Sequence, residues 1–149
     1  MSQECAHDID PKAAYAKYKL FFDCTLDAAF FVDANGKILD ANTVAVSMYG
    51  YSLKELHSMN IRNLRTTSER ASVEKLLKEA FVQGLVYETV HQRKDESEFP
   101  VEISSRGLIM DHTRFMISIV RDITSRKEQE RSLARLAAIV ESSDLSRAT

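Results

Sequence analysis

The 149-residue sequence contains no tryptophan, two cysteines, two prolines and four glycines. Two cysteines, Cys5 and Cys24, are too few for a disulfide framework, so reduced thiols in a cytoplasmic protein are the expectation. The apolar runs are short, such as that from Ala28 to Val32, and none is long enough to span a bilayer. A basic segment followed by an apolar one is absent from the N-terminus, so no signal peptide is visible.

An excess of charge of one sign is also missing. The formal net charge is −2, and the sequence is 44% hydrophobic and 28% charged. This balance is ordinary for a soluble globular protein of one domain with flanking segments. It provides no bulk attraction to nucleic acid or to an anionic membrane, and we expect this segment to contact neither.

Sequence signatures of catalysis are equally absent. No glycine-rich phosphate loop occurs, the four histidines are scattered, and cysteine and histidine show no metal-ligand spacing. No nucleophile lies near a candidate base in the sequence. We therefore expect no catalytic residues, no metal site and no enzymatic activity in this segment.

The N-terminal region divides into a polar segment and a helix. Residues 1–11 are expected to be a disordered arm, and residues 12–24 carry an apolar stripe with helical spacing. A lone helix cannot bury aromatic side chains on both sides, so the stripe favours a homodimer through this helix. The interface candidates are Tyr18, Phe21 and Phe22.

Two strands and two short helices are expected next. Asn35-Gly36, between two apolar strands, predicts a hairpin with a type I′ turn. Asn42 then reads as the N-cap of a short helix, and Ser52 with Glu55 forms a capping box at the start of another.

The second half of the sequence predicts a helix followed by three strands. Apolar residues at helical spacing cover 68–83, and Gly84 ends that helix. Alternating strands then cover roughly 85–93, 98–110 and 114–123, and their short connections favour an antiparallel meander.

A charged helix follows the last strand, with no glycine or proline at the joint. It is expected to begin near Thr124 or Ser125, with Ser125 and Glu128 as a capping box. Its apolar seam is spaced as in a short coiled coil: Gln129, Leu133, Leu136 and Val140.

Three motifs occur in the order typical of PAS domains. They are the run from Asn42 to Gly50-Tyr51-Ser52-Leu53-Lys54-Glu55-Leu56, the hairpin Arg93-Lys94-Asp95 through Phe99-Pro100-Val101-Glu102, and Arg121-Asp122-Ile123-Thr124. The resemblance covers about residues 17–130. It implies an α+β fold: a five-stranded antiparallel sheet with short helices packed on one face, plus N- and C-terminal flanking helices. The core would span 25–124.

The resemblance also bears on the C-terminal segment, 125–149. In PAS domains the Asp-Ile-Thr triplet joins the last strand to a signalling helix, so Asp122, Ile123 and Thr124 are the candidate signal-relay residues. The Asp122 carboxylate is expected to anchor the strand end, and the Thr124 hydroxyl to cap the helix. The run 136–144 resembles the entry helix of another PAS domain. The segment is therefore a signalling helix or linker, or the start of a second PAS domain.

The sequence gives little support for a bound flavin or haem. Flavin-binding relatives carry a reactive cysteine where this chain has Asn60 to Arg65, and haem-binding relatives carry a histidine on the long helix, which 68–83 lacks. These absences argue against flavin and haem and leave an unidentified small organic ligand as the remaining option.

Alternation along the meander strands identifies candidate ligand contacts. The residues expected on the inner face are Tyr87, Thr89, His91, Val101, Ile103, Ser105 and Ser118. Two alternatives stay open. Val86 and Val90 are equally good inward residues, and a core histidine satisfied by a backbone carbonyl is an ordinary structural feature.

The leading hypothesis is a PAS sensory module that detects a small-molecule or partner signal. It would pass the signal to an output domain of the same parent chain, such as a histidine kinase or diguanylate cyclase. The alternative is a ligand-free PAS module for protein interaction or dimerisation. A redox or light sensor is a third class.

Overall fold

The structure, a computed structural model, describes residues 11–66 and 73–147. The expected arm, apart from Pro11, and the expected helix start at Ser68 lie outside these residues. The elements are α1 (Pro11–Cys24), β1 (Ala28–Asp33), β2 (Ile38–Ala41), α2 (Thr43–Tyr49), α3 (Leu53–His57), η2 (Ile61–Leu64), α4 (Val73–Gln83), β3 (Leu85–Gln92), β4 (Glu98–Met110), β5 (Thr113–Asp122) and α5 (Thr124–Arg147).

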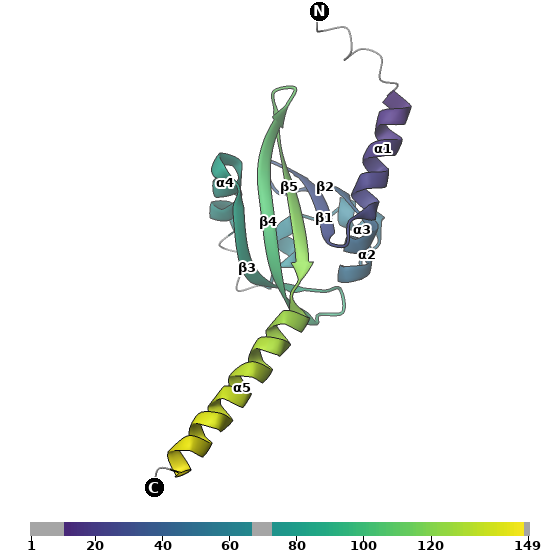
Figure 1. Ribbon diagram of the computed structural model, residues 1–149. Helices are drawn as coiled ribbons and strands as arrows, with labels where there is room; N and C mark the ends of the chain where they lie inside the picture. The colour runs from purple at the N-terminus through teal and green to yellow at the C-terminus, as the bar shows by residue number, and fades with distance from the viewer. Residues whose placement is uncertain (1–10, 67–72, 148–149) are drawn as a thin grey trace, which may run out of the picture.

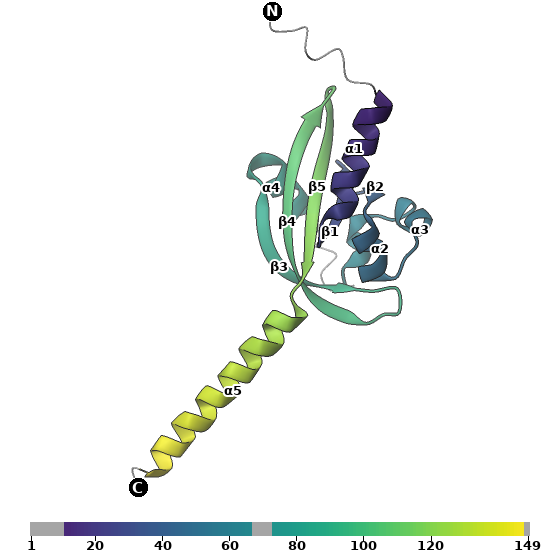
Figure 2. The same ribbon diagram turned by 45° about the vertical axis from the view of Figure 1, so that its right-hand side comes forward.

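The strands form one antiparallel sheet in the order β2-β1-β5-β4-β3. The predicted five-stranded sheet and its β3-β4-β5 meander are confirmed. In both views α5 leaves the end of β5 and projects away from the sheet (Figure 1, Figure 2). The β1 and β5 strands pair at the centre, so the strand that leads into α5 lies in the middle of the sheet.

The core lies between one face of the sheet and the short helices. Strand residues such as Phe30 and Val101 are fully buried together with Tyr49 of α2, Leu56 of α3 and Leu64 of η2. This arrangement follows from the alternation of the strands, because every second side chain points to the same face.

The predicted type I′ turn at Asn35-Gly36 is wrong, although the hairpin is present. Of the two turn residues Asn35 and Gly36, only Gly36 has a positive φ, of 86°, and its amide donates to the Asp33 carbonyl. This is a type I turn followed by a left-handed glycine. The Asp33 carboxylate accepts from the Asn35 and Lys37 amides, at 2.8 and 2.9 Å, and this local competition favours the wider turn.

The two-residue turn of the I′ kind lies elsewhere. Asp111 and His112 have φ values of 50° and 63°, and the flanking residues Met110 and Thr113 pair with each other. The strand pairing of β4 and β5 therefore imposes a left-handed conformation on two residues that are not glycine.

Helix α4 approaches β4 so closely that a side chain is excluded at Gly107. A Cβ there would lie 2.3 Å from Cδ1 and 2.6 Å from Cα of Phe81. We expect Gly107→Ala to lower the free energy of unfolding by about 2 kcal/mol, because the helix has to move to relieve the overlap. Ser104→Ala, at an exposed position of the same strand, should change it by less than about 0.5 kcal/mol in the same urea titration. Equal values for the two variants would contradict this packing.

Candidate functional site

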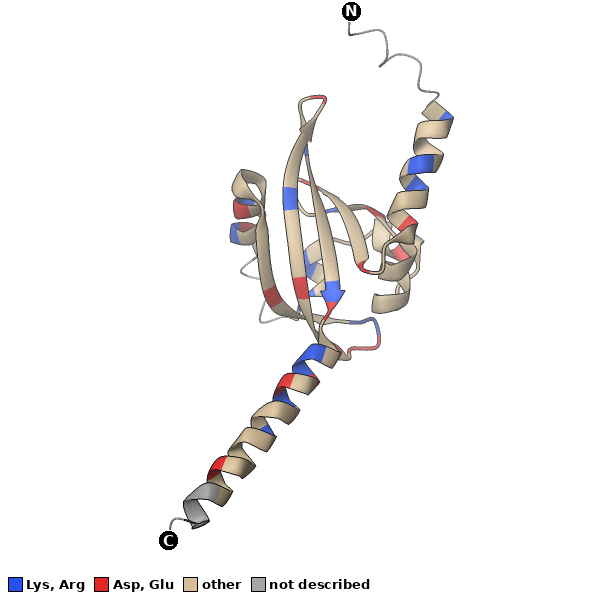
Figure 3. Cartoon of the chain, viewed as in Figure 1, with Lys and Arg blue, Asp and Glu red and all other residues tan. Residues whose placement is uncertain are grey.

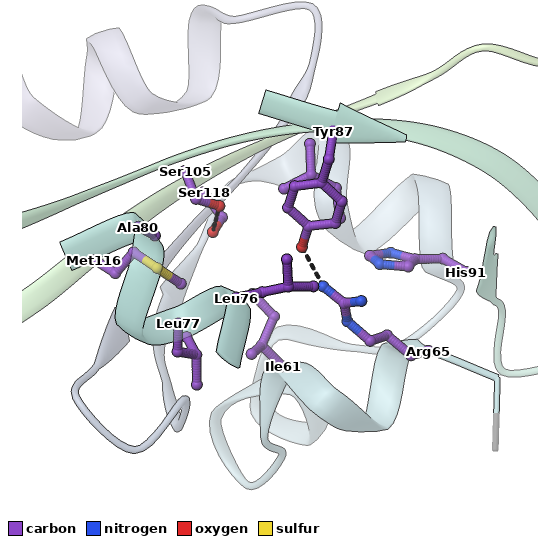
Figure 4. Close-up of a pocket in the computed structure, with 11 residues that line it drawn as sticks. Ile61, Arg65, Leu76, Leu77, Ala80, Tyr87, His91, Ser105, Met116 and Ser118 are labelled. Carbon is purple, nitrogen blue, oxygen red and sulfur yellow. Dashed lines mark hydrogen bonds between the residues drawn. The ribbon is translucent and has the colours of Figure 1, made fainter. Parts of the chain in front are cut away.

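The candidate site is a small pocket between α4, the end of η2 and the inner face of β3, β4 and β5 (Figure 4). Its lining combines aliphatic side chains with four polar groups that are almost fully buried, and with Tyr87. The lining residues are Ile61, Arg65, Leu76, Leu77, Ala80, Tyr87, His91, Ile103, Ser105, Met116 and Ser118.

The predicted orientation of the strands is confirmed. His91 is 1% exposed and Tyr87 half-buried, whereas Val86 and Val90 are 66% and 38% exposed. The alternative with both valines inward is therefore wrong. One β3 face thus points into the pocket and the other away from it.

The pocket gathers most of the candidate contacts. Tyr87, His91, Ile103, Ser105 and Ser118 line it. Two other candidates lie outside its lining: Val101, which is buried in the core, and Thr89, which is half-buried. The ligand-contact role of these residues stays a prediction.

His91 is held by a tyrosine rather than by a backbone carbonyl. Its Nδ1 lies 2.6 Å from the Tyr49 hydroxyl oxygen, which is fully buried in the core. Its Nε2 is buried and has no hydrogen-bond partner among the described residues. Burial, reinforced by the charge of Arg65, lowers the pKa of His91 from 6.5 to about 3, so the ring is neutral at physiological pH.

This buried histidine predicts a loss of stability in mild acid. The unfolded chain takes up the proton near pH 6.5 and the folded chain only near pH 3. The contribution of His91 to the free energy of unfolding is therefore fully present above pH 6.5, and it falls as the pH decreases toward 3. Between pH 7 and pH 5 we expect a loss of about 2 kcal/mol in urea titrations, in a range above most carboxylate pKa values.

His91→Gln should remove most of this pH dependence. His112→Asn, at an exposed turn, should retain it, because asparagine also tolerates a positive φ. A parallel decline in both variants would show that another group is responsible.

Arg65 is the main polar residue that sequence reasoning missed. It is 4% exposed and donates through Nη2 to the Tyr87 hydroxyl (Figure 4). Its backbone also bridges to that of His91, which draws the end of η2 against β3. The run from Asn60 to Arg65, which stands where flavin-binding relatives carry their reactive cysteine, was the available signal, but it does not reveal that this arginine is buried.

A hydroxyl pair completes the polar lining. The Ser105 and Ser118 oxygens lie 2.7 Å apart on neighbouring strands, and both side chains are buried. Either hydroxyl is the donor in this bond. The pair therefore offers one further hydroxyl proton to the pocket.

The pocket is small. The space open to the centre of a water-sized sphere is about 20 Å³, which is enough for about one water molecule. This space is smaller than a flavin or porphyrin ring, and the expected absence of these cofactors stays a prediction. Among the described residues, no three histidine, cysteine or acidic side chains gather as metal ligands do.

Hydrogen bonds of Asp122 connect the end of β5 to the start of α5. The Asp122 carboxylate accepts from the Thr124 amide at 2.9 Å and from the Thr124 hydroxyl, and it pairs with Arg93 at 3.4 Å. Its predicted anchoring role is confirmed. The predicted roles of Thr124 and Ser125 as caps are wrong, because α5 already begins at Thr124 and the Asp122 carboxylate satisfies the first amide.

Ion pairs hold the first turn of α5 against the outer face of the sheet. Arg126 pairs with Glu88 of β3 and Glu102 of β4, and Lys127 lies 3.0 Å from Glu88. Figure 3 shows acidic positions on β3 and β4 close to the basic start of α5. These contacts are partly exposed, so they fix geometry more than they add stability.

Helix α1 has no buried residue among Pro11–Cys24. Phe21 is 69% exposed, Phe22 is half-buried, and the exposed Tyr18 stacks on Phe22 and donates to Asp40 of β2. The apolar surface of α1 is thus available, and its role as a dimer interface stays a prediction. Within 11–66 and 73–147 no helix combines the length and hydrophobicity needed to cross a bilayer.

Comparisons with known proteins agree with this geometry. The chain is 26% identical over 121 residues to a methyl sulfide methyltransferase-associated sensor from Methanosarcina acetivorans, covering 80% of this chain but only 12% of that sensor. The PAS domain of a Colwellia psychrerythraea protein superposes with a TM-score of 0.69 at 21% identity, over 75% of this chain and 98% of the other.

A domain of a sensory box sensor histidine kinase/response regulator from Geobacter sulfurreducens superposes with a TM-score of 0.63 at 19% identity. The match covers 74% of this chain and 96% of the other. At these identities the structural matches establish the fold. The sequence profile of the PAS domain matches residues 26–125, and the chain therefore belongs to the PAS domain family.

Proposed function

We propose that this PAS domain is a cytoplasmic sensory module without catalysis of its own. It detects a small-molecule or partner signal in its core and transmits the signal through α5 to an output domain in the same parent protein. The main support for this proposal is the alternation of side chains along β3. Tyr87 and His91 face the pocket, while Glu88, between them, pairs with Arg126 and Lys127 of α5.

Strand β3 thus supplies a short route from pocket to helix. Adjacent residues of a strand point to opposite faces, so a shift of Tyr87 toward a ligand also displaces Glu88. A second route runs along β5, where Ser118 lines the pocket and Asp122 meets the first amide of α5.

The output domain would be a histidine kinase or a diguanylate cyclase. The named kinase among the structural relatives supports the first, and the small share of the Methanosarcina sensor that this chain spans leaves room for such a domain.

Transmission is tested by perturbing the pocket and observing α5. Ser118→Ala removes a pocket hydroxyl, and we expect altered amide hydrogen exchange and chemical shifts over 124–130 of α5. The matched control is Ser104→Ala, the same substitution on the outer face of the neighbouring strand. If Ser118→Ala changes only its immediate neighbours in β4 and β5, the proposed transmission fails.

The alternative function is a ligand-free PAS module for interaction and dimerisation, and the small volume of the pocket favours it. A native mass spectrum of the purified protein separates the two proposals. Additional mass that is released on denaturation supports ligand sensing, and the bare chain mass supports the alternative.

We also propose a homodimer through α1, which both functions would use. Phe21→Glu places a charge on the exposed apolar stripe and should shift the protein from dimer to monomer in light scattering after size exclusion. Val82→Glu, at an 85% exposed position of α4, should leave the mass unchanged. A dimer that survives Phe21→Glu, or a wild-type monomer, would rule out this interface.

A further inference from the structure

We propose that a groove beside α4 docks an acidic amphipathic helix of a partner protein. The groove lies between α4, the end of the β4–β5 hairpin and the β1–β2 turn. In both views α4 lies beside the part of β4 that is far from α5 (Figure 1, Figure 2). Among the described lining residues the groove shares only Leu77 with the pocket. The inference therefore goes beyond the proposed function and does not depend on a ligand in the pocket.

The groove is large enough to take several side chains of a partner. Its volume is about 750 Å³, whereas that of the pocket is about 20 Å³. Sites that hold drug-sized molecules have volumes of about 300–1,000 Å³. The lack of space that limits the pocket does not apply to the groove.

Apolar side chains of α4 and β4 face each other across the groove. Leu77 and Phe81 lie one helical turn apart on α4, and Leu108 belongs to β4. At the rim, Val82 and Ile109 are 85% and 70% exposed. Exposed apolar surface of this kind marks interaction sites. A small molecule held between the walls would leave the rim in water, whereas a protein segment that lies across the groove would cover it.

The groove also carries an excess of positive charge. Its described lining contains three basic residues, Arg62, Lys78 and Arg114, and one acidic residue, Glu74. Glu74 lies 3.8 Å from Arg62, whereas Lys78 and Arg114 have no ion-pair partner among the described residues. The whole chain has a net charge of −2, so this excess is local. Acidic side chains of a partner would complement Lys78 and Arg114 and favour its approach to the groove.

A helix is the form of partner that suits both features. Apolar side chains at positions i, i+3, i+4 and i+7 of a helix form one stripe, which fills an apolar groove, while acidic residues beside the stripe reach the basic rim. A helix also satisfies its own backbone hydrogen bonds. An extended segment would place unpaired backbone groups against the apolar side chains of α4 and β4.

The test is a titration of the isotopically labelled chain with two synthetic helical peptides of about four turns. Both carry the same leucine and phenylalanine stripe, and the positions beside the stripe are glutamate in one peptide and lysine in the other. We expect the glutamate peptide to shift resonances of groove residues saturably, including those of Phe81 and Ile109. The lysine peptide should bind at least about tenfold more weakly, and added salt should weaken binding of the glutamate peptide.

Two double variants locate the binding site. Lys78→Glu combined with Arg114→Glu should weaken binding of the glutamate peptide at least about tenfold and make the lysine peptide the tighter ligand. Lys75→Glu combined with Arg106→Glu changes the net charge equally at exposed positions of α4 and β4 outside the groove lining. This control should leave both affinities unchanged.

Three results would overturn the inference. They are equal affinities of the two peptides for the wild-type chain, peptide shifts confined to the apolar stripes of α1 or α5, and no shifts with either peptide. An equal effect of the two double variants would show that net charge, and not the groove, determines binding, and it would overturn the inference as well. None of these results bears on the pocket, whose sensory role is tested by Ser118→Ala and by native mass spectrometry.

Discussion

Replacing Asn42 by alanine is expected to lower the free energy of unfolding by about 4 kcal/mol, since it removes one cap and several buried hydrogen bonds. The Asn42 side chain is fully buried. Its Oδ1 accepts from the amides of Ala29 and Ala45, at 2.9 and 3.0 Å. Its Nδ2 donates to the carbonyls of Phe22 and Asp27, both at 3.0 Å. The residue therefore links the end of α1, strand β1 and helix α2.

Asn60→Ala is the matched control for this prediction. Asn60 also caps a short helix, but it is half-buried, and among the described residues its amide nitrogen donates only to the Asn35 carbonyl. We expect a loss of about 1 kcal/mol there. Urea titrations of both variants measure the difference, and similar values would show that the network around Asn42 contributes no more than a cap.

Replacing Ile123 by alanine is expected to cost about 3 kcal/mol and to release α5 from the sheet. Ile123 is buried between the last strand and the helix, and its amide donates to the Pro100 carbonyl at 3.1 Å. Its carbonyl accepts the first helical hydrogen bond, from Lys127. Loss of the side chain leaves a cavity at this joint, so amide exchange over the first turns of α5 should accelerate relative to the core.

Ile117→Ala provides the same substitution on the same strand, at an outward-facing position. It should cost less than about 1 kcal/mol and leave exchange in α5 unchanged. Equal acceleration of α5 exchange in both variants would indicate a general loss of stability and not a specific release of the helix.

The features predicted correctly from sequence are those set by local chemistry. The cap at Asn42 and the capping box at Ser52 are present, because a side-chain oxygen placed before a helix satisfies its free amides regardless of the rest of the fold. The inner face of β3 was the leading expectation, with Val86 and Val90 as the open alternative, because alternation fixes orientation only once one residue is placed.

The features that were missed depend on contacts between distant segments. The Asn42 amide group also bonds residues 15 and 20 positions earlier, which the local pattern around the cap does not reveal. Arg65 was missed because arginine is ordinarily exposed, and only the approach of η2 to β3 buries it. The turn at Asp33 to Lys37 was misassigned because hydrogen bonds from backbone amides to the Asp33 carboxylate outweigh the preference of Asn35-Gly36 for a type I′ turn.

The central claim is that the sheet and the beginning of α5 move as one body. Residual dipolar couplings of the labelled chain test it most directly, since they report the orientation and order of each amide in a common frame. We predict that couplings from the core strands and from residues 124–135 of α5 fit a single alignment tensor. Couplings in α5 that require a separate tensor, or that are scaled toward zero while the core stays ordered, would contradict the account.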